Sequence, residues 1–237
     1  MSELFFARTE KKYRMDAGKK ERFLQAAKPY VKADIYGKYS LCNIYFDTEA
    51  DELIRISMEK PIYKEKLRLR SYGVPKETDE VFLEIKKKYE GTVYKRRAGM
   101  TLSQAVDYIE KGKRPGDADS QIMSEIDYFI QFYHAKPKLY LAYDRLAFVG
   151  REEPELRITV DESIRSRRDR LDLTQGDDGE MLLPDGEAVL EIKTNGAMPL
   201  WLTDILSREG IYPVSFSKYG EIYKKELIQK IKKEAVQ

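Results

Sequence analysis

The sequence predicts an α+β protein built on a closed antiparallel β-barrel, with a polar interior and helices packed on the outside. About seven segments alternate between apolar and charged residues with the two-residue period of a strand. About five further segments carry an apolar stripe at helical spacing and need a surface to cover. The charged strand faces hold Arg, Lys and Glu rather than the Ser, Thr and Gln usual on solvated faces. A barrel with these faces turned inward is the economical arrangement.

Composition limits the class of protein. Of 237 residues, 43 are Lys or Arg and 41 are Asp or Glu, so the net charge of +2 disfavours a general nucleic-acid binder. The single cysteine, Cys42, excludes an internal disulfide, and its apolar neighbours predict a buried thiol in a reducing compartment. Neither a signal peptide nor a membrane span is visible. No boundary divides the chain, so we expect one cytoplasmic domain over residues 1–237.

The first part of the chain predicts a strand, a helix and a second strand. Residues 5–15 alternate, and one face of this strand carries Arg8, Glu10, Lys12 and Arg14. Asp16 is a suitable N-cap for a helix over residues 17–31. Residues 40–48 form the next strand, with Cys42 on its apolar face. Residues 54–59 are too short to assign.

The central segment carries the strongest charge pattern. Strands over residues 64–70 and 81–88 are joined through a turn at Gly73, and residues 92–97 add a third strand. Alternation gives each of these strands a charged face: Lys64, Lys66, Arg68 and Arg70 on the first, Glu84, Lys86 and Lys88 on the second, and Lys95 and Arg97 on the third. Such a stripe repels itself unless it is hydrated or meets an anion. For this hairpin alone, a solvated surface is the simpler interpretation.

Two helices should follow the central strands. A capping box over residues 101–104 opens the first helix, and Gly112 ends it. Ser120 caps the second helix, whose apolar stripe predicts packing against the core. His134 follows this stripe and has no histidine or cysteine nearby in sequence, so we assign it no metal or catalytic role.

The C-terminal half predicts three more strands, over residues 138–149, 155–161 and 188–194. Their charged faces include Arg145, Arg157, Asp161, Glu191 and Lys193. The basic run 165–170 follows the middle strand, and residues 175–187 are rich in Gly, Asp and Pro and predict a loop. One helix begins at Pro199, and the last helix covers residues 219–233.

Ten cations on the strand faces would need a highly charged anion if they lined an interior. They are Lys12, Lys66, Arg68, Arg70, Lys86, Lys95, Arg97, Arg145, Arg157 and Lys193. At an effective dielectric constant near 20, each like-charged pair at about 6 Å costs on the order of 2–3 kcal/mol. A chain of phosphates would supply the counter-charge, since Arg binds phosphate bidentately and Lys binds it as a point charge. Acids among these cations are suited to hold Mg²⁺ or Mn²⁺ on phosphate oxygens.

Seven short motifs share an order along the chain: Ile44–Thr48, Arg68–Arg70, Leu83–Lys86, Tyr143–Phe148, Arg157–Asp161, Leu190–Lys193 and Phe216–Tyr219. This ordered set resembles the VTC domain, the polyphosphate polymerase module of the vacuolar transporter chaperone. That family is a branch of the triphosphate tunnel metalloenzymes. The resemblance covers the chain from about residue 4 to about residue 228.

The resemblance implies an eight-stranded tunnel that transfers the γ-phosphate of ATP, or of another triphosphate, to inorganic polyphosphate and releases ADP. It implies phosphate contacts by Lys12, Lys66, Arg68, Arg70, Lys86, Lys95, Arg97, Arg145, Arg157, Lys193 and Lys218. Among these, the catalytic residues would be Arg68, Arg70, Lys86, Arg145 and Arg157. Mn²⁺ or Mg²⁺ would be held by Glu191, with Glu10 and Asp161 as further candidates.

The chain departs from the hydrolytic and cyclase relatives of this family. At the first strand those proteins carry a motif that resembles Glu-x-Glu-x-Lys, where this chain has only Glu10 and Lys12. On a late strand they carry paired glutamates, where this chain has Glu191 and Lys193. Fewer carboxylates argue against a two-metal hydrolase. A tunnel triphosphatase or polyphosphatase and a non-catalytic polyphosphate-binding module remain the alternatives.

Overall fold

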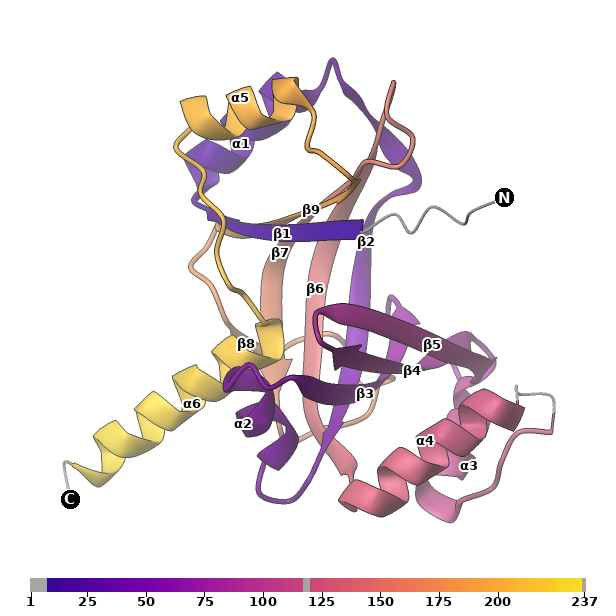
Figure 1. The fold of residues 1–237 in the computed structure, drawn as a ribbon. Helices are drawn as coiled ribbons and strands as arrows, with labels where there is room; N and C mark the ends of the chain where they lie inside the picture. Colours follow the sequence, from indigo (N-terminus) through magenta and orange to yellow (C-terminus); the bar gives the residue numbers. More distant parts are fainter. Residues whose placement is uncertain (1–7, 117–119, 236–237) are drawn as a thin grey trace. The chain divides into compact units, whose positions relative to one another are not determined.

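The structure is a computed structural model that describes residues 8–116 and 120–235 (Figure 1). Its strands are β1 (Arg8–Met15), β2 (Val31–Asp47), β3 (Tyr63–Tyr72), β4 (Glu80–Tyr89), β5 (Thr92–Thr101), β6 (Lys136–Gly150), β7 (Arg157–Arg167), β8 (Glu180–Met181) and β9 (Ala188–Asn195). Its helices are α1 (Ala17–Ala27), α2 (Glu52–Met58), α3 (Leu102–Lys111), α4 (Ser120–Tyr133), α5 (Leu200–Arg208) and α6 (Lys218–Glu234). Among the described helices, none is both long and apolar enough to cross a membrane.

The strands form one sheet with the hydrogen-bonded order β1-β9-β7-β6-β2-β3-β4-β5, and β8 pairs with β7. The α+β class and the large antiparallel sheet are confirmed. The predicted closure into a barrel is wrong at the level of hydrogen bonds, because over the described residues β1 and β5 end this order without pairing. Alternation of apolar and charged residues determines which face of each strand is charged. It does not determine whether the two edge strands come close enough to form hydrogen bonds with each other.

The chain divides into two compact units, each assembled from three segments. The first unit comprises residues 1–40, 143–164 and 181–216, and the second comprises residues 41–142, 165–180 and 217–237. Strands β2, β6, β7 and β8 contribute residues to both units. The prediction of a single domain over residues 1–237 stays a prediction.

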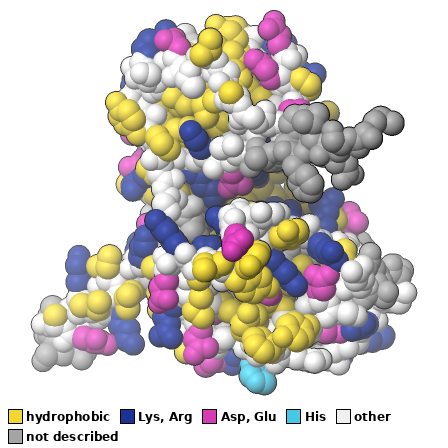
Figure 2. Space-filling model, in the orientation of Figure 1, with side chains coloured by type: hydrophobic (Ala, Val, Ile, Leu, Met, Phe, Trp, Pro, Cys, Tyr) yellow, Lys and Arg dark blue, Asp and Glu magenta, His cyan; other side chains and the backbone are white. Residues whose placement is uncertain are grey.

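In the first unit, α1 and α5 cover the apolar face of β1, β7 and β9 (Figure 1). Asp16 caps α1 as predicted, its Oδ1 accepting a hydrogen bond from the Lys19 N–H at 2.8 Å. The helix ends at Ala27 rather than residue 31, because Pro29 has no N–H to continue it. Hydrophobic side chains are also visible at the surface around α1 and α5 (Figure 2).

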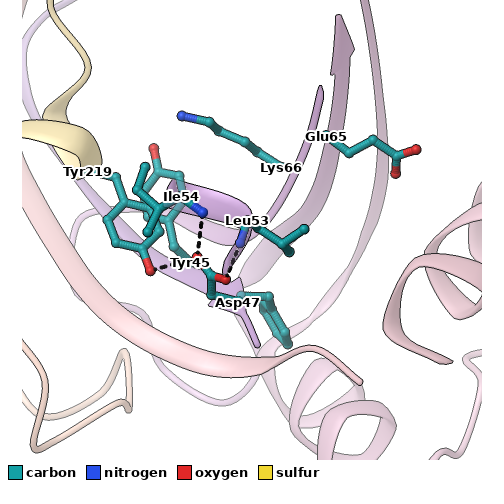
Figure 3. Close-up of a pocket in the computed structure, with 8 residues that line it drawn as sticks. Tyr45, Asp47, Leu53, Ile54, Glu65, Lys66 and Tyr219 are labelled. Atoms are coloured by element: carbon teal, nitrogen blue, oxygen red, sulfur yellow. Dashed lines mark hydrogen bonds between the residues drawn. The ribbon is translucent and has the colours of Figure 1, made fainter. Parts of the chain in front are cut away.

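In the second unit, buried Asp47 fixes the start of two helices (Figure 3). Its carboxylate accepts hydrogen bonds from the Leu53 N–H at 2.9 Å and the Ile54 N–H at 3.0 Å, which places α2. It also accepts one from the Tyr219 hydroxyl at 3.0 Å, which places the first turn of α6. Burial raises the pKa of Asp47 in spite of these hydrogen bonds.

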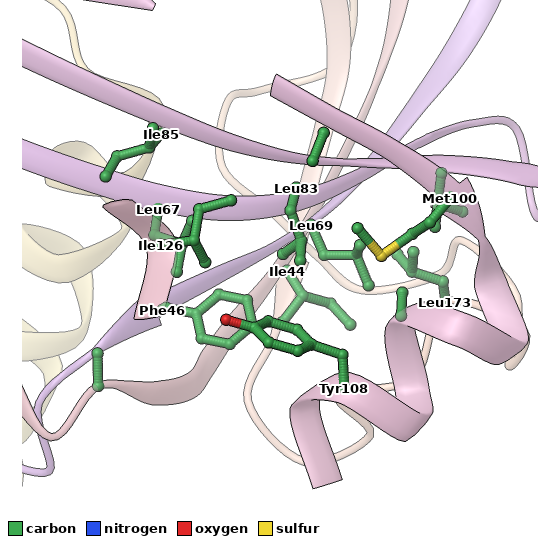
Figure 4. Close-up of a cluster of buried hydrophobic side chains, with 14 of the residues drawn as sticks. Ile44, Phe46, Leu67, Leu69, Leu83, Ile85, Met100, Tyr108, Ile126 and Leu173 are labelled. Atoms are coloured by element: carbon green, nitrogen blue, oxygen red, sulfur yellow. The ribbon is translucent and has the colours of Figure 1, made fainter. Parts of the chain in front are cut away.

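The main core of the second unit lies between β2–β5 and the helices α3 and α4 (Figure 4). The residues that alternate with the charged ones, such as Leu67, Leu83 and Ile85, are at most 1% exposed. The capping box at Thr101 and the left-handed Gly112 that ends α3 are both confirmed, as is the burial of Cys42. The opposite face of the same strands is therefore left for charged residues.

Candidate functional site

One face of the second unit's strands is charged across β2, β3, β4 and β5. Residues opposed in an antiparallel pair share a face. The pairing puts Tyr45 opposite Arg68, Arg68 opposite Glu84, and Glu84 opposite Arg97. A second row across the same strands consists of Lys66, Lys86 and Lys95. We term this surface the arginine face: Asn43, Tyr45, Lys66, Arg68, Arg70, Glu84, Lys86, Lys95 and Arg97.

Glu84 lies at the centre of the arginine face and is 2% exposed. It accepts hydrogen bonds from Arg68 Nε at 2.8 Å and Arg68 Nη2 at 2.6 Å. It also pairs with Arg70 Nη1 at 3.7 Å and Lys95 Nζ at 2.7 Å. Burial would raise the pKa of Glu84, but the charges of Arg68 and Arg70 lower it to about 2. The ionised carboxylate thus holds three cations in place.

We expect Glu84→Gln to lower the free energy of unfolding by about 3 kcal/mol at neutral pH, because three cations would lose their shared partner. The lowered pKa of Glu84 determines how its contribution to the free energy of unfolding changes with pH. The stabilisation by Glu84 is complete above its ordinary value of 4.5 and is lost as the pH falls through about 2. Urea unfolding should therefore show the difference from wild type shrinking in acid.

Glu125→Gln is the matched control, because Glu125 pairs with Arg96 at 2.5 Å and Lys87 at 3.3 Å while 25% exposed. We expect it to cost less than about 1 kcal/mol. Equal losses in the two variants would contradict a central role for Glu84.

Two polar residues of β2 position the arginines of β3. Arg70 Nε donates to Asn43 Oδ1 at 2.8 Å, and Asn43 Nδ2 donates to the Leu141 carbonyl at 3.0 Å. Arg68 Nη1 donates to the Tyr45 hydroxyl oxygen at 3.0 Å. Both guanidinium groups are therefore oriented before any ligand binds, which lowers the entropy lost on binding.

Tyr45 gives the arginine face a pH dependence. Burial would raise the pKa of Tyr45, but the charges of Arg68 and Arg70 and the hydrogen bond from Arg68 lower it to about 8.

Above about pH 8 the Tyr45 side chain is a phenolate, which neutralises Arg68 and repels phosphate. We expect the affinity for tripolyphosphate to fall about tenfold between about pH 7 and about pH 9. Tyr45→Phe should lack this decrease when dissociation constants are measured by titration calorimetry. If wild type and Tyr45→Phe lose affinity equally, the decrease comes from the titration of groups other than Tyr45.

Lys218 is brought beside the arginine face by the start of α6. The Ser217 side chain caps this helix, accepting from the Gly220 N–H at 3.3 Å and from Lys66 Nζ at 3.4 Å. Lys66 points away from its neighbour Glu65 (Figure 3). Lys218, the first residue of the helix, is half-buried. A helix N-terminus adds a favourable dipole for anions at this position.

The first unit has a second charged face, built from β1, β6, β7 and β9. The pairing places Glu10 opposite Lys193, Lys12 opposite Glu191, and Glu191 opposite Thr159. Lys12 Nζ lies 3.5 Å from Glu10 and 3.7 Å from Glu191, while Lys193 Nζ pairs with both carboxylates. We term this surface the glutamate face: Glu10, Lys12, Arg145, Arg157, Thr159, Asp161, Glu191 and Lys193.

Arg145 and Asp161 form a bidentate ion pair on the glutamate face. Arg145 Nε donates to Oδ1 at 2.6 Å and Nη2 donates to Oδ2 at 2.8 Å, and the carboxylate is fully buried. Arg157 lies opposite Lys193, is exposed, and forms no ion pair within the described part of the chain. Arg157 is therefore the more accessible of the two arginines.

The donors for a metal ion are fewer than predicted. Across residues 8–116 and 120–235, no three acidic, histidine or cysteine side chains gather in a way that could hold one. Both oxygens of Asp161 accept from Arg145, which leaves Glu10 and the largely buried Glu191 as the remaining carboxylates of this face. The hydroxyl of Thr159, opposite Glu191, is buried and has no hydrogen-bond partner among the described residues. Two carboxylates and a hydroxyl fit Mg²⁺ or Mn²⁺, which take their other ligands from phosphate and water.

The predicted site residues therefore fall into two sets. The arginine face holds Lys66, Arg68, Arg70, Lys86, Lys95 and Arg97, with Lys218 beside it. The glutamate face holds Lys12, Arg145, Arg157, Lys193, Glu10, Asp161 and Glu191. Sequence reasoning assigned no role to Asn43, Tyr45 or Thr159. The alternation of their own strands is the signal for them, because each shares a face with the arginines or with Glu191.

The family model described as the VTC domain matches residues 7–226 of this chain. No curated protein matches the sequence.

Two solved structures are similar in fold. One is a proposed adenylate cyclase from Bacillus halodurans, with a TM-score of 0.55 and 14% identity over 88% of this chain and 92% of that chain. The other is HpAC1 from Hippeastrum, a proposed adenylyl cyclase described as having a dominant triphosphatase activity. Its TM-score is 0.50, with 14% identity over 91% of this chain and 95% of that chain. At such identities the likeness concerns the fold alone.

Proposed function

Because this chain belongs to the VTC domain family, we propose that it is a polyphosphate polymerase that transfers the γ-phosphate of ATP to a growing polyphosphate chain and releases ADP. The charge of the arginine face carries this proposal. Its six cations are Lys66, Arg68, Arg70, Lys86, Lys95 and Arg97, and Glu84 is the one carboxylate among the nine residues that define this face. Triphosphate and polyphosphate supply several negative charges in a row and so complement such a surface.

The chemistry proposed for these residues is positioning and charge neutralisation. Arg68 and Arg70, already oriented by Glu84 and Asn43, bind phosphate oxygens together with Lys86, and Arg145 and Arg157 serve the same role on the glutamate face. A terminal oxygen of the acceptor chain attacks the γ-phosphorus in line, and ADP leaves with the electron pair of the broken P–O bond. That oxygen is ionised at neutral pH, so no general base is needed. Glu191 and Glu10 would hold Mn²⁺ or Mg²⁺, which neutralises phosphate charge when bound.

A tunnel triphosphatase is the second candidate. The description of the Hippeastrum protein as a dominant triphosphatase supports it, because that protein is similar in fold. The distribution of acids favours the polymerase, since Glu10 and Glu191 are both paired with lysines rather than grouped with further carboxylates. A hydrolase that activates water commonly uses two metal ions and more acidic ligands.

The balance of products separates these functions. We expect the protein, supplied with ATP and Mn²⁺ or Mg²⁺, to form much more ADP than free phosphate, because the transferred phosphate remains in chains. Equal amounts of ADP and free phosphate would identify a triphosphatase. Binding of triphosphate without any turnover would identify a polyphosphate-binding module.

A further inference from the structure

A pocket of about 390 Å³ opens on the apolar side of the first unit. Its floor is formed by Phe23, Ala27, Val31 and Ile158, none more than 6% exposed. Ile158 faces away from Arg157 and Thr159 because successive strand residues point to opposite sides. The pocket is therefore separate from the glutamate face. Its volume lies within the range of about 300–1,000 Å³ typical of small-molecule sites.

Three cations surround the mouth of this pocket: Lys28, Lys32 and Arg151. All three side chains are exposed, and none makes an ion pair or side-chain hydrogen bond with any residue that the structure describes. No acidic residue is among those that line the pocket in the described ranges. Three unpaired positive charges beside an apolar cavity whose lining contains no acid complement a ligand with an anionic head and an apolar body.

The backbone fixes the position of Arg151 at this mouth. The Arg151 N–H donates to the Tyr30 carbonyl at 2.8 Å, and the Tyr30 ring stacks on Trp201 with centroids 4.5 Å apart and planes 4° apart. The Trp201 indole also donates to Glu153 at 3.3 Å. Trp201 is the only tryptophan in the sequence, so its fluorescence reports on the residues beside the pocket.

We propose that this pocket binds a fatty acid, a single acyl chain ending in a carboxylate. The chain lies against Phe23, Phe148 and Ile158, where it replaces water on apolar side chains. The carboxylate meets the planar guanidinium of Arg151, which can bind it bidentately, with Lys28 and Lys32 adding charge. This site is independent of phosphate transfer and uses none of the residues on the arginine face or the glutamate face.

Titration with laurate below its micelle-forming concentration tests the proposal through Trp201 fluorescence and calorimetry. We expect saturable micromolar binding to the wild-type chain. Arg151→Glu, which reverses the charge at the mouth, and Ala33→Phe, which fills the pocket from an exposed lining position, should each weaken it by about tenfold or more. Lys11→Glu, an exposed cation of the same unit that does not line the pocket, should leave it unchanged.

Ligands of the same chain length show which feature is recognised. Dodecyltrimethylammonium and dodecanol should bind about tenfold more weakly than laurate. The proposal fails if laurate does not bind, if the cationic detergent binds equally well, or if both pocket variants bind laurate like wild type. Preference for dodecyl phosphate would overturn the carboxylate assignment. Unchanged tripolyphosphate binding in Arg151→Glu and Ala33→Phe would show that both variants are folded.

Discussion

Arg68→Ala should weaken tripolyphosphate binding by about 30- to 100-fold, because a charged bidentate contact is worth about 2–3 kcal/mol. Arg68 lies in the middle of the arginine face, held by Glu84 at 2.6 and 2.8 Å and by Tyr45 at 3.0 Å. Its loss removes charge from the centre of the surface. The fold should survive, since Glu84 keeps Arg70 and Lys95 as partners. Titration calorimetry measures the affinity and thermal unfolding confirms the fold.

Arg96→Ala is the matched control for Arg68→Ala. Arg96 belongs to β5 but faces away from the arginine face, where it pairs with Glu125. We expect its tripolyphosphate affinity to equal that of wild type. A loss of tripolyphosphate affinity in Arg96→Ala as large as that in Arg68→Ala would show that only net charge matters.

Competition with duplex DNA gives a second test of Arg68→Ala. If the arginine face were a nucleic-acid surface, this variant would lose affinity for DNA and for tripolyphosphate to the same extent.

Glu191→Gln should reduce turnover with Mn²⁺ or Mg²⁺ by about a hundredfold or more, because it removes a carboxylate proposed to hold the metal. The same change should leave metal-free tripolyphosphate binding unchanged or tighter. Glu191 pairs with Lys193 and lies 3.7 Å from Lys12, so its neutralisation releases both lysines toward phosphate. Initial rates and metal-free calorimetry measure the two effects separately.

Glu187→Gln serves as the control for Glu191→Gln, because Glu187 pairs with exposed Arg14 at 2.7 Å outside the glutamate face. We expect wild-type rates and affinities from it. Weaker metal-free binding by Glu191→Gln would show that Glu191 positions the lysines rather than a metal. Unchanged turnover would contradict any metal role for this residue.

Local signals in the sequence predicted most elements of the fold. The caps at Asp16 and Thr101 depend on neighbouring backbone groups, so their sequence signature is sufficient. The start of β2, residues 31–39, was missed because it lacks clear alternation. The basic end of β7 was also missed: Arg167 there donates to the carbonyls of Arg170, Asp172, Gly176 and Asp178, in the loop that follows the strand, and periodicity does not reveal such contacts.

The candidate site was predictable to the level of strand faces. Alternation places Arg68 and Arg70 on one face of their strand, and the register of β3 and β4 adds Glu84 to that face. Alternation does not distinguish a functional residue from an anchor. Tyr45 and Asp47 share a face of β2. Tyr45 contacts Arg68, whereas Asp47 is buried and forms hydrogen bonds with the first turns of α2 and α6. Barrel closure, likewise, depends on which strands meet rather than on which residues they contain.

The fate of the γ-phosphate tests the central claim most directly. ATP labelled in its γ-phosphate is incubated with the protein, Mn²⁺ or Mg²⁺ and a short polyphosphate primer, and the products are separated by gel electrophoresis. We predict that the label enters chains longer than the primer, in step with ADP release, and that Arg68→Ala loses this incorporation. Label recovered only as free phosphate would contradict polymerase activity.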